Sequence, residues 1–140
     1  MLGGHCKENI KNFAKKALGV PFADRGRDLA GWDCWGMLLA AYQECFGIAL
    51  PEGLEYSRQN SAEAAAALKE GAQTWREIPA GQEHPGDVLF ARPCHVGLVL
   101  APGRMLNCRE GAGTIIERYD HAVWRRSIIG IYRHARLADL

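Results

Sequence analysis

The chain changes in character after Gly71, and this change limits its fold more than any other feature. Beyond it come short segments rich in β-branched and apolar residues, and Gly or Pro stands in most of the gaps between them. This pattern is typical of a series of short strands. The expected strands are 74–78, 87–91, 95–100, 105–109, 114–118 and 128–134.

The first half has helical periodicity instead. From about Lys7 to Leu18 the apolar residues fall on one face, and Gly19 and Pro21 end the run. A second helix is predicted from Cys34 to about Phe46, and a third from Ser61 to about Lys69. Helices followed by strands predict the α+β class, with N-terminal helices packed on a C-terminal antiparallel sheet.

Composition excludes several classes of protein. The 140 residues fit one domain spanning 1–140, and a chain of this length needs no disulfides to fold. A net charge of +1 gives no basis for nucleic-acid binding. No apolar run is long enough to span a membrane, and the first residues lack the apolar core of a secretory signal. The five cysteines are expected to be thiols in a reducing compartment.

Cys34 differs from the other cysteines in its position. It lies in the run Gly31-Trp32-Asp33-Cys34-Trp35-Gly36, directly before an apolar stretch of helical composition, with Asp33 as the expected N-cap. Amide groups and the dipole at a helix N-terminus favour an anion. Such settings lower the pKa of a cysteine from about 8.5 to roughly 3.5–7.5. Cys34 is therefore predicted to be a nucleophile; the alternative is a small buried apolar residue.

A cysteine nucleophile needs a base and a group that orients the base. His95 opens an apolar segment, so we expect it at the rim of the sheet, where it can meet a helix terminus. Asn107 is a polar residue among apolar neighbours in the next segment, and its carbonyl oxygen can accept the second imidazole N–H. A plain two-residue turn at 102–103 would put the two side chains on opposite faces. We therefore expect an odd-numbered loop or a β-bulge between them.

In combination, these motifs resemble the NlpC-type papain-like cysteine peptidases of bacterial cell walls. The resemblance extends from about Lys11 to Arg133. It rests on the Trp32-Asp33-Cys34-Trp35-Gly36 run, on Pro85-Gly86-Asp87-Val88-Leu89, and on His95-Val96-Gly97-Leu98-Val99 with a polar residue 12 positions after the histidine. The C-terminal run 124–134 is most similar to members from phage and prophage tail modules.

The resemblance implies hydrolysis of peptide bonds in peptidoglycan stem peptides, commonly the D-glutamyl–diaminopimelate bond. By position it makes Cys34 the nucleophile, His95 the general base and acid, and Asn107 the third member, with the backbone N–H of Cys34 as an oxyanion donor. It implies no cofactor and no metal. The expected partners are peptidoglycan peptides and, for a tail component, phage tail proteins. Such a protein would be made in the cytoplasm and would act on the wall after virion attachment.

Three positions depart from the family pattern. Many members have histidine where Asn107 stands, tyrosine where Phe22 stands, and serine where Trp35 stands. An asparagine can still orient an imidazole, so activity is compatible with the first change. Phe22, Asp33 and Trp35 are the expected substrate-binding residues, and the changes at Phe22 and Trp35 affect the specificity that the resemblance implies. For Trp35, as for Trp32, core packing is the alternative.

Two other functions remain open at this point. One is an inert tail-assembly protein with the same fold, which the three departures favour. The other is a papain-like acyltransferase or thioesterase in which the histidine precedes the cysteine, as His95 precedes Cys108. A zinc site at Cys94 and Cys108 is disfavoured, because strand alternation points each of them away from its neighbouring candidate residue.

Overall fold

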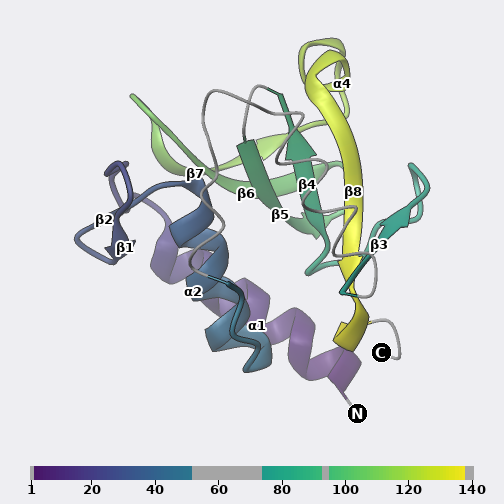
Figure 1. Cartoon of the computed structure of the whole chain (residues 1–140), viewed down its shortest axis with the longest axis horizontal. Helices are drawn as coiled ribbons and strands as arrows, with labels where there is room; N and C mark the ends of the chain where they lie inside the picture. The colour runs from purple at the N-terminus through teal and green to yellow at the C-terminus, as the bar shows by residue number, and fades with distance from the viewer. Residues whose placement is uncertain (1, 52–73, 93–94, 138–140) are drawn as a thin grey trace.

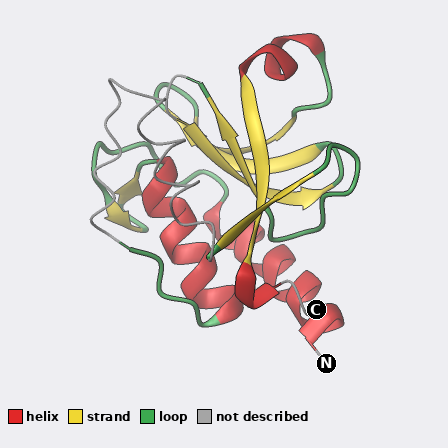
Figure 2. Ribbon diagram, turned by 45° about the vertical axis from the view of Figure 1, so that its right-hand side comes forward, coloured by secondary structure: helices red, strands yellow, loops and turns green. Residues whose placement is uncertain are grey.

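The computed structural model describes residues 2–51, 74–92 and 95–137. Two helices, α1 (Leu2–Ala17) and α2 (Cys34–Phe46), pack on one side of a six-stranded antiparallel sheet. Both lie below the strands in Figure 1 and in Figure 2, while the short helix α4 (Ala122–Ser127) lies above them. The predicted α+β class, with N-terminal helices on a C-terminal antiparallel sheet, is confirmed.

The strand order in the sheet is β3-β8-β4-β5-β6-β7, and every neighbouring pair is antiparallel. Four consecutive strands therefore form a meander, while the last strand returns to lie between β3 and β4. The bounds are β3 Trp75–Ile78, β4 Val88–Ala91, β5 His95–Ala101, β6 Arg104–Arg109, β7 Gly113–Arg118 and β8 Ile128–His134. All six predicted strands are present, with ends shifted by at most one residue.

Both described N-terminal helices follow their sequence signals. α1 buries Ile10, Phe13, Ala14 and Ala17 as predicted, but the helix ends one residue before Leu18, whose side chain is 47 % exposed rather than part of the apolar face. α2 begins after its N-cap Asp33 and ends at Gly47, which has a left-handed backbone with φ 65°. Backbone N–H groups just after the last turn donate hydrogen bonds to the carbonyls of Gln43 and Tyr42, and this left-handed ending favours glycine.

The core has two parts, one on each face of the sheet. The larger lies under α1 and α2 and contains Val96, Leu98, Leu106 and Cys108 from the central strands. The smaller lies on the other face and contains Val99 and Met105. Alternate residues of β5 and β6 therefore face opposite layers, as the pleat of a strand requires. Both layers exclude water from the sheet that carries the site.

The loop before β4 is tied to both layers by polar contacts. Tyr42 of α2 donates a hydrogen bond to the Gly86 carbonyl at 2.5 Å. The carboxylate of Asp87, which is almost fully buried, accepts two hydrogen bonds from Arg133 of β8 at 2.8 and 2.9 Å. The Pro85-Gly86-Asp87 motif therefore connects α2, β4 and β8, and Asp87 has a structural partner.

Some local structure departs from expectation. A small two-stranded ladder that was not predicted, β1 (Arg27–Asp28) with β2 (Gly31–Trp32), lies just before α2. Helix α4 is not predicted, because it buries no side chain and its N-cap, His121, makes no side-chain capping bond. The helix predicted at 61–69 falls outside the described residues. No helix in the described ranges combines the length and the apolar character needed to cross a membrane.

Candidate active site

Cys34 is the first residue of α2, where its N-cap is fixed by several bonds. Asp33 Oδ1 accepts hydrogen bonds from the backbone N–H of Gly36 at 2.7 Å and from the guanidinium of Arg27 at 2.9 Å. Asp33 Oδ2 accepts the amide of Arg25 at 3.2 Å. The predicted cap is confirmed, and Cys34 itself is buried, with 9 % of its surface exposed. The thiol therefore sits at the positive end of the α2 dipole, a position that favours a thiolate.

Contacts of Trp32 place this end of α2 against one end of the sheet. The Cys108 thiol of β6 donates to the Trp32 carbonyl at 3.3 Å. The Trp32 indole donates to Thr114 Oγ1 of β7 at 2.8 Å. β6 ends, and β5 and β7 begin, at this same end of the sheet. Cys34 and the first residue of β5, His95, are therefore brought to one end of the molecule.

His95 and Asn107 form a hydrogen bond, with 2.8 Å between His95 Nε2 and Asn107 Oδ1. The pairing of β5 with β6 shifts between Val99 and Ala101, so a bulge in β5 comes just before the two-residue turn. Beyond the bulge Leu98 pairs with Leu106, and this register puts the two polar side chains on the same face. The expected bulge is confirmed.

The hydrogen bonds of Asn107 fix which way its amide points. Its side chain is fully buried, and Nδ2 donates to the Ile115 carbonyl at 3.3 Å and to Glu117 Oε2 at 2.9 Å. Both of these partners are acceptors, so the amide oxygen must face His95. An oxygen can only accept, and Nε2 of a neutral His95 therefore carries the proton. Nδ1 is left as the basic nitrogen of the ring.

The environment of His95 favours the neutral imidazole. Burial lowers the pKa of His95 below its ordinary value, the Asn107 hydrogen bond opposes this, and the charges of Arg109 and Glu117 act in opposite directions. The ring also stacks on the indole of Trp124 from α4, with centroids 5.7 Å apart and 28° between the planes. Trp124 thus covers the imidazole.

The two parts of the site come from different faces of the sheet. Val96 and Cys108 belong to the core under the helices, together with Cys34. Their neighbours His95 and Asn107 therefore project to the other face. His95 is the first residue of its strand, so it lies at the rim of the sheet, at the end where Trp32 places the start of α2.

The expected substrate-binding residues lie near the start of α2. Phe22 is half-buried and bridges to Trp32, and Asp33 is half-buried with both carboxylate oxygens bonded. Trp35 is only 3 % exposed, and its indole donates to the Pro51 carbonyl at 3.1 Å. Trp32 is likewise buried in the core. Burial favours packing for both tryptophans.

Sequence reasoning missed several residues that contact the site. Arg27 donates a hydrogen bond to the N-cap Asp33, and Trp124 covers His95. Glu117 accepts a hydrogen bond from Asn107, and Arg109 in turn donates to Glu117. Glu117 could have been found from the sequence. It lies two residues after Ile115 in a predicted strand, so both side chains share one face, and that strand lies next to the one that carries Asn107. Trp124 had none, because it belongs to a short helix without an apolar face.

Three cysteines and His134 are buried in the packed interior. Cys34, Cys45 and Cys108 are buried thiols, and Cys45 lies in the core as predicted. Burial raises the pKa of Cys108, which makes it a poor nucleophile. His134 is buried against Trp75, with ring centroids 5.0 Å apart, although its sequence neighbours indicate a surface position. Among the described residues, no three His, Cys, Asp or Glu side chains gather as metal ligands would.

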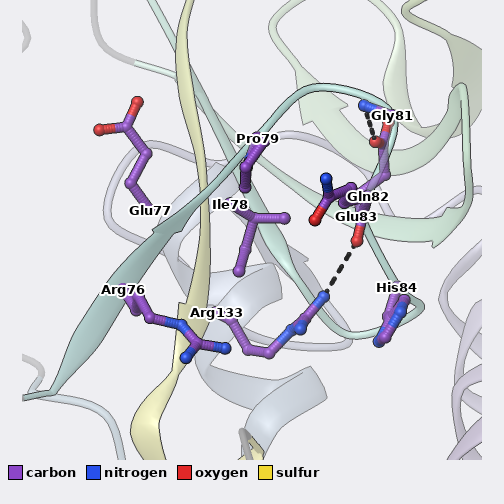
Figure 3. A pocket seen from close by; sticks show the side chains of 9 residues that line it. All are labelled: Arg76, Glu77, Ile78, Pro79, Gly81, Gln82, Glu83, His84 and Arg133. Atoms are coloured by element: carbon purple, nitrogen blue, oxygen red, sulfur yellow. Dashed lines mark hydrogen bonds between the residues drawn. The ribbon is translucent and has the colours of Figure 1, made fainter.

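A hollow of about 600 Å³ lies beside β3 and the 79–84 loop (Figure 3). Two of the charged groups that line it are bonded within the protein. Arg133 donates to Asp87 and to the Gln82 carbonyl, and Glu83 accepts from the Gly81 amide and from Tyr119. These bonds hold the loop in place, and none of the predicted site residues lines this hollow.

Comparisons with known proteins agree with this geometry. The chain is 26 % identical over 131 residues to the gamma-DL-glutamyl hydrolase of Bacillus subtilis (strain 168), which covers 89 % of the chain but only 28 % of that protein. The structure matches the NlpC/p60 domain of the peptidoglycan hydrolase SagA with a TM-score of 0.65 and 20 % identity, covering 91 % of this chain and 97 % of that one.

A further match is RipD of Mycobacterium tuberculosis, a non-catalytic NlpC/p60 domain protein adapted to peptidoglycan binding. Its TM-score is 0.64 at 17 % identity, with 93 % of this chain and 97 % of that one covered. The similarity to SagA and RipD confirms the papain-like α+β fold. The NlpC/P60 family profile matches residues 19–133, which include all of the candidate site residues. The chain therefore belongs to the NlpC/P60 family.

Proposed function

We propose that the protein is a cysteine hydrolase that cleaves peptide bonds in peptidoglycan stem peptides. The observation that carries the proposal is the bond from His95 Nε2 to Asn107 Oδ1, at the same end of the sheet as Cys34. A buried amide with a fixed orientation holds the imidazole in one tautomer and leaves Nδ1 as a base. Two similar proteins with hydrolase names, the Bacillus subtilis protein and SagA, support the reaction type.

In the proposed mechanism the Cys34 thiol and His95 Nδ1 meet at the rim of the sheet. The thiol passes its proton to Nδ1, and the sulfur attacks the carbonyl carbon of the scissile bond. The backbone N–H of Cys34 stabilises the oxyanion. His95 then protonates the leaving amine, and a water activated by the same ring releases the acyl group from the sulfur. Phe22, Asp33 and Trp35 shape the substrate-binding surface beside Cys34, and Trp35 does so from a buried position.

The bond cleaved and the biological setting are proposed from the resemblance of the sequence to the family. The bond cleaved is the D-glutamyl–diaminopimelate bond, and a glutamyl substrate is consistent with the name of the Bacillus subtilis relative. The proposed setting is a phage or prophage tail, on the similarity of residues 124–134 to members of that kind. Peptidoglycan peptides and tail proteins are the corresponding partners.

The test is digestion of purified muropeptides, read by mass spectrometry. We expect wild type to release the peptide fragments and Cys34→Ala to lose activity by about 10³-fold or more, because the covalent step is removed. Cys45→Ala is the matched control, since it removes a buried thiol from the same helix. Equal cleavage by wild type and Cys34→Ala would refute the assigned nucleophile.

An inert protein with this fold is the second candidate, and RipD is the observation that favours it. The two functions differ in the reactivity of Cys34. A hydrolase requires alkylation of Cys34 by iodoacetamide at neutral pH to be faster than that of a free model thiol, with Cys45 as the internal reference. A rate no faster than the model thiol favours the inert protein. The buried, bonded Cys108 argues against the thioesterase alternative.

A further inference from the structure

A row of polar side chains continues from Asn107 toward the edge of the sheet. Asn107 Nδ2 donates to Glu117 Oε2 at 2.9 Å. Arg109 donates two hydrogen bonds to the same carboxylate along one edge of its guanidinium, from Nε to Oε2 at 3.0 Å and from Nη2 to Oε1 at 2.8 Å. Asn107 is fully buried, and Glu117 is half-buried. The carboxylate is thus held in a two-bond pair while it accepts from the amide.

Strand register brings these groups together. Asn107 pairs with Ile115, and Glu117 lies two residues further along β7, in the diagonal position on the same face. Arg109 also alternates onto this face, opposite Gly113, which has no side chain to block it. The row His95, Asn107, Glu117 and Arg109 therefore crosses β5, β6 and β7 without leaving one face.

We propose that Glu117 is a positioning residue of the active site: its carboxylate, held by Arg109, keeps the Asn107 amide turned so that the oxygen faces His95. The inference deepens the proposed function and rests on it. An asparagine side chain fits its site in two orientations of nearly equal shape, and only hydrogen bonds distinguish them. A carboxylate accepts and never donates, so it admits the amide NH₂ and excludes the amide oxygen.

Removing the carboxylate has two separable consequences. The amide keeps only the longer bond to the Ile115 carbonyl, at 3.3 Å, so the flipped orientation becomes accessible. Arg109 also loses its counter-ion. The charged groups that act on His95 are Arg109 on β6 and Glu117 on β7, while α4 places the uncharged indole of Trp124 against the ring. Loss of Glu117 therefore favours the neutral ring still more strongly.

The test is ¹⁵N NMR of the His95 ring in the full chain, together with muropeptide kinetics. Glu117→Ala is expected to change a ring protonated at Nε2 into a mixture of tautomers and to lower the pKa of His95. Glu117→Gln keeps an oxygen for the amide but no charge, so we expect the wild-type tautomer with a lowered pKa. Glu77→Ala, which removes an exposed glutamate from the opposite edge strand, is the control and should change neither.

In kinetics, Glu117→Ala should lower kcat about 10-fold with little change in KM, a loss like that caused by removing the outer hydrogen-bond partners of metal-bound histidines. Glu117→Gln should recover most of kcat near neutral pH. If Glu117→Ala leaves both the tautomer and kcat unchanged, the positioning role is wrong while the hydrolase proposal stands. If wild type cleaves nothing but the tautomer still changes, the hydrolase proposal fails and the contact between Glu117 and Asn107 stands. If Glu117→Ala fails to fold, Glu117→Leu takes its place, because leucine fills similar space without an acceptor and should give the same mixture of tautomers.

Discussion

The imidazole of His95 touches two partners of different chemistry. Asn107 accepts a hydrogen bond at one edge of the ring, and Trp124 covers a face of the ring. The amide selects the tautomer, while the indole excludes water and so supports the neutral form. Together they leave one nitrogen, Nδ1, available for proton transfer, as a base paired with a cysteine requires.

Trp124→Ala tests the indole cover. Burial is the largest cause that lowers the pKa of His95, so exposing the ring should raise this pKa and move the acid limb of the pH–rate profile to higher pH. The stacking itself is worth about 0.5–1.5 kcal/mol. We expect Trp124→Phe to restore the wild-type profile. This direction is opposite to the one expected for Glu117→Ala, so the two effects can be told apart.

Val123→Ala is the control for Trp124, since it shortens the exposed neighbour on the same helix. An unchanged acid limb in Trp124→Ala would contradict the covering role. So would an equal shift in Val123→Ala, which would indicate that the whole helix had moved.

At the scale of elements, the start of α2 is fixed by close backbone packing. A methyl group added to Gly36 would overlap the carbonyl oxygen of Gly26, and one added to Gly26 would overlap that of Gly31. The three glycines let the β1–β2 hairpin lie directly on the first turn of α2. This contact holds Arg27 against the Asp33 cap, and through it the position of Cys34.

Gly36→Ala is therefore expected to destabilise the protein by about 1–3 kcal/mol, because backbone must move to admit the methyl group. Urea unfolding measures the loss. Gly97→Ala is the comparison, since its new methyl group would meet only the movable side chain of Met105 and should cost less. A Gly36→Ala protein as stable as wild type, with the same Cys34 alkylation rate, would show that the hairpin does not fix the helix start.

For the whole molecule, His134, which is buried, and His95, which is half-buried, make stability depend on pH. Burial lowers the pKa of His95 and of His134 in the folded chain, and nearby Arg136 adds to the effect on His134. The unfolded chain has the ordinary histidine pKa of about 6.5 and therefore binds more protons below it. The contribution of both rings to the free energy of unfolding is full above about pH 6.5 and is lost as the pH falls through their lower native values.

Urea unfolding between pH 8 and pH 5 measures this dependence. We expect stability to fall on the acid side of about pH 6.5, and we expect His134→Gln to reduce the fall. His121→Ala, which removes an exposed imidazole at the start of α4, should leave the profile as it is. A wild-type profile that is flat over this range would contradict the lowered pKa values of the two rings.

The sequence by itself determined the elements whose causes are local. Asp33 caps α2 because a short acceptor side chain before a helical run satisfies its first amides, and Gly47 ends it because glycine adopts the left-handed backbone. Alternation and turn residues determined the six strands. The same local rules singled out Cys34, His95 and Asn107 as candidate site residues and showed that a bulge or an odd loop was needed between the last two.

Only the tertiary structure decided which residues from distant segments meet. It chose the bulge over the odd loop, buried Trp35, placed Trp124 on His95, and set Glu117 against the Asn107 amide. These outcomes depend on the register of β6 with β7 and on the return of the chain through α4. Register and return path are set by the fit of whole layers, and no window of neighbouring residues contains that information.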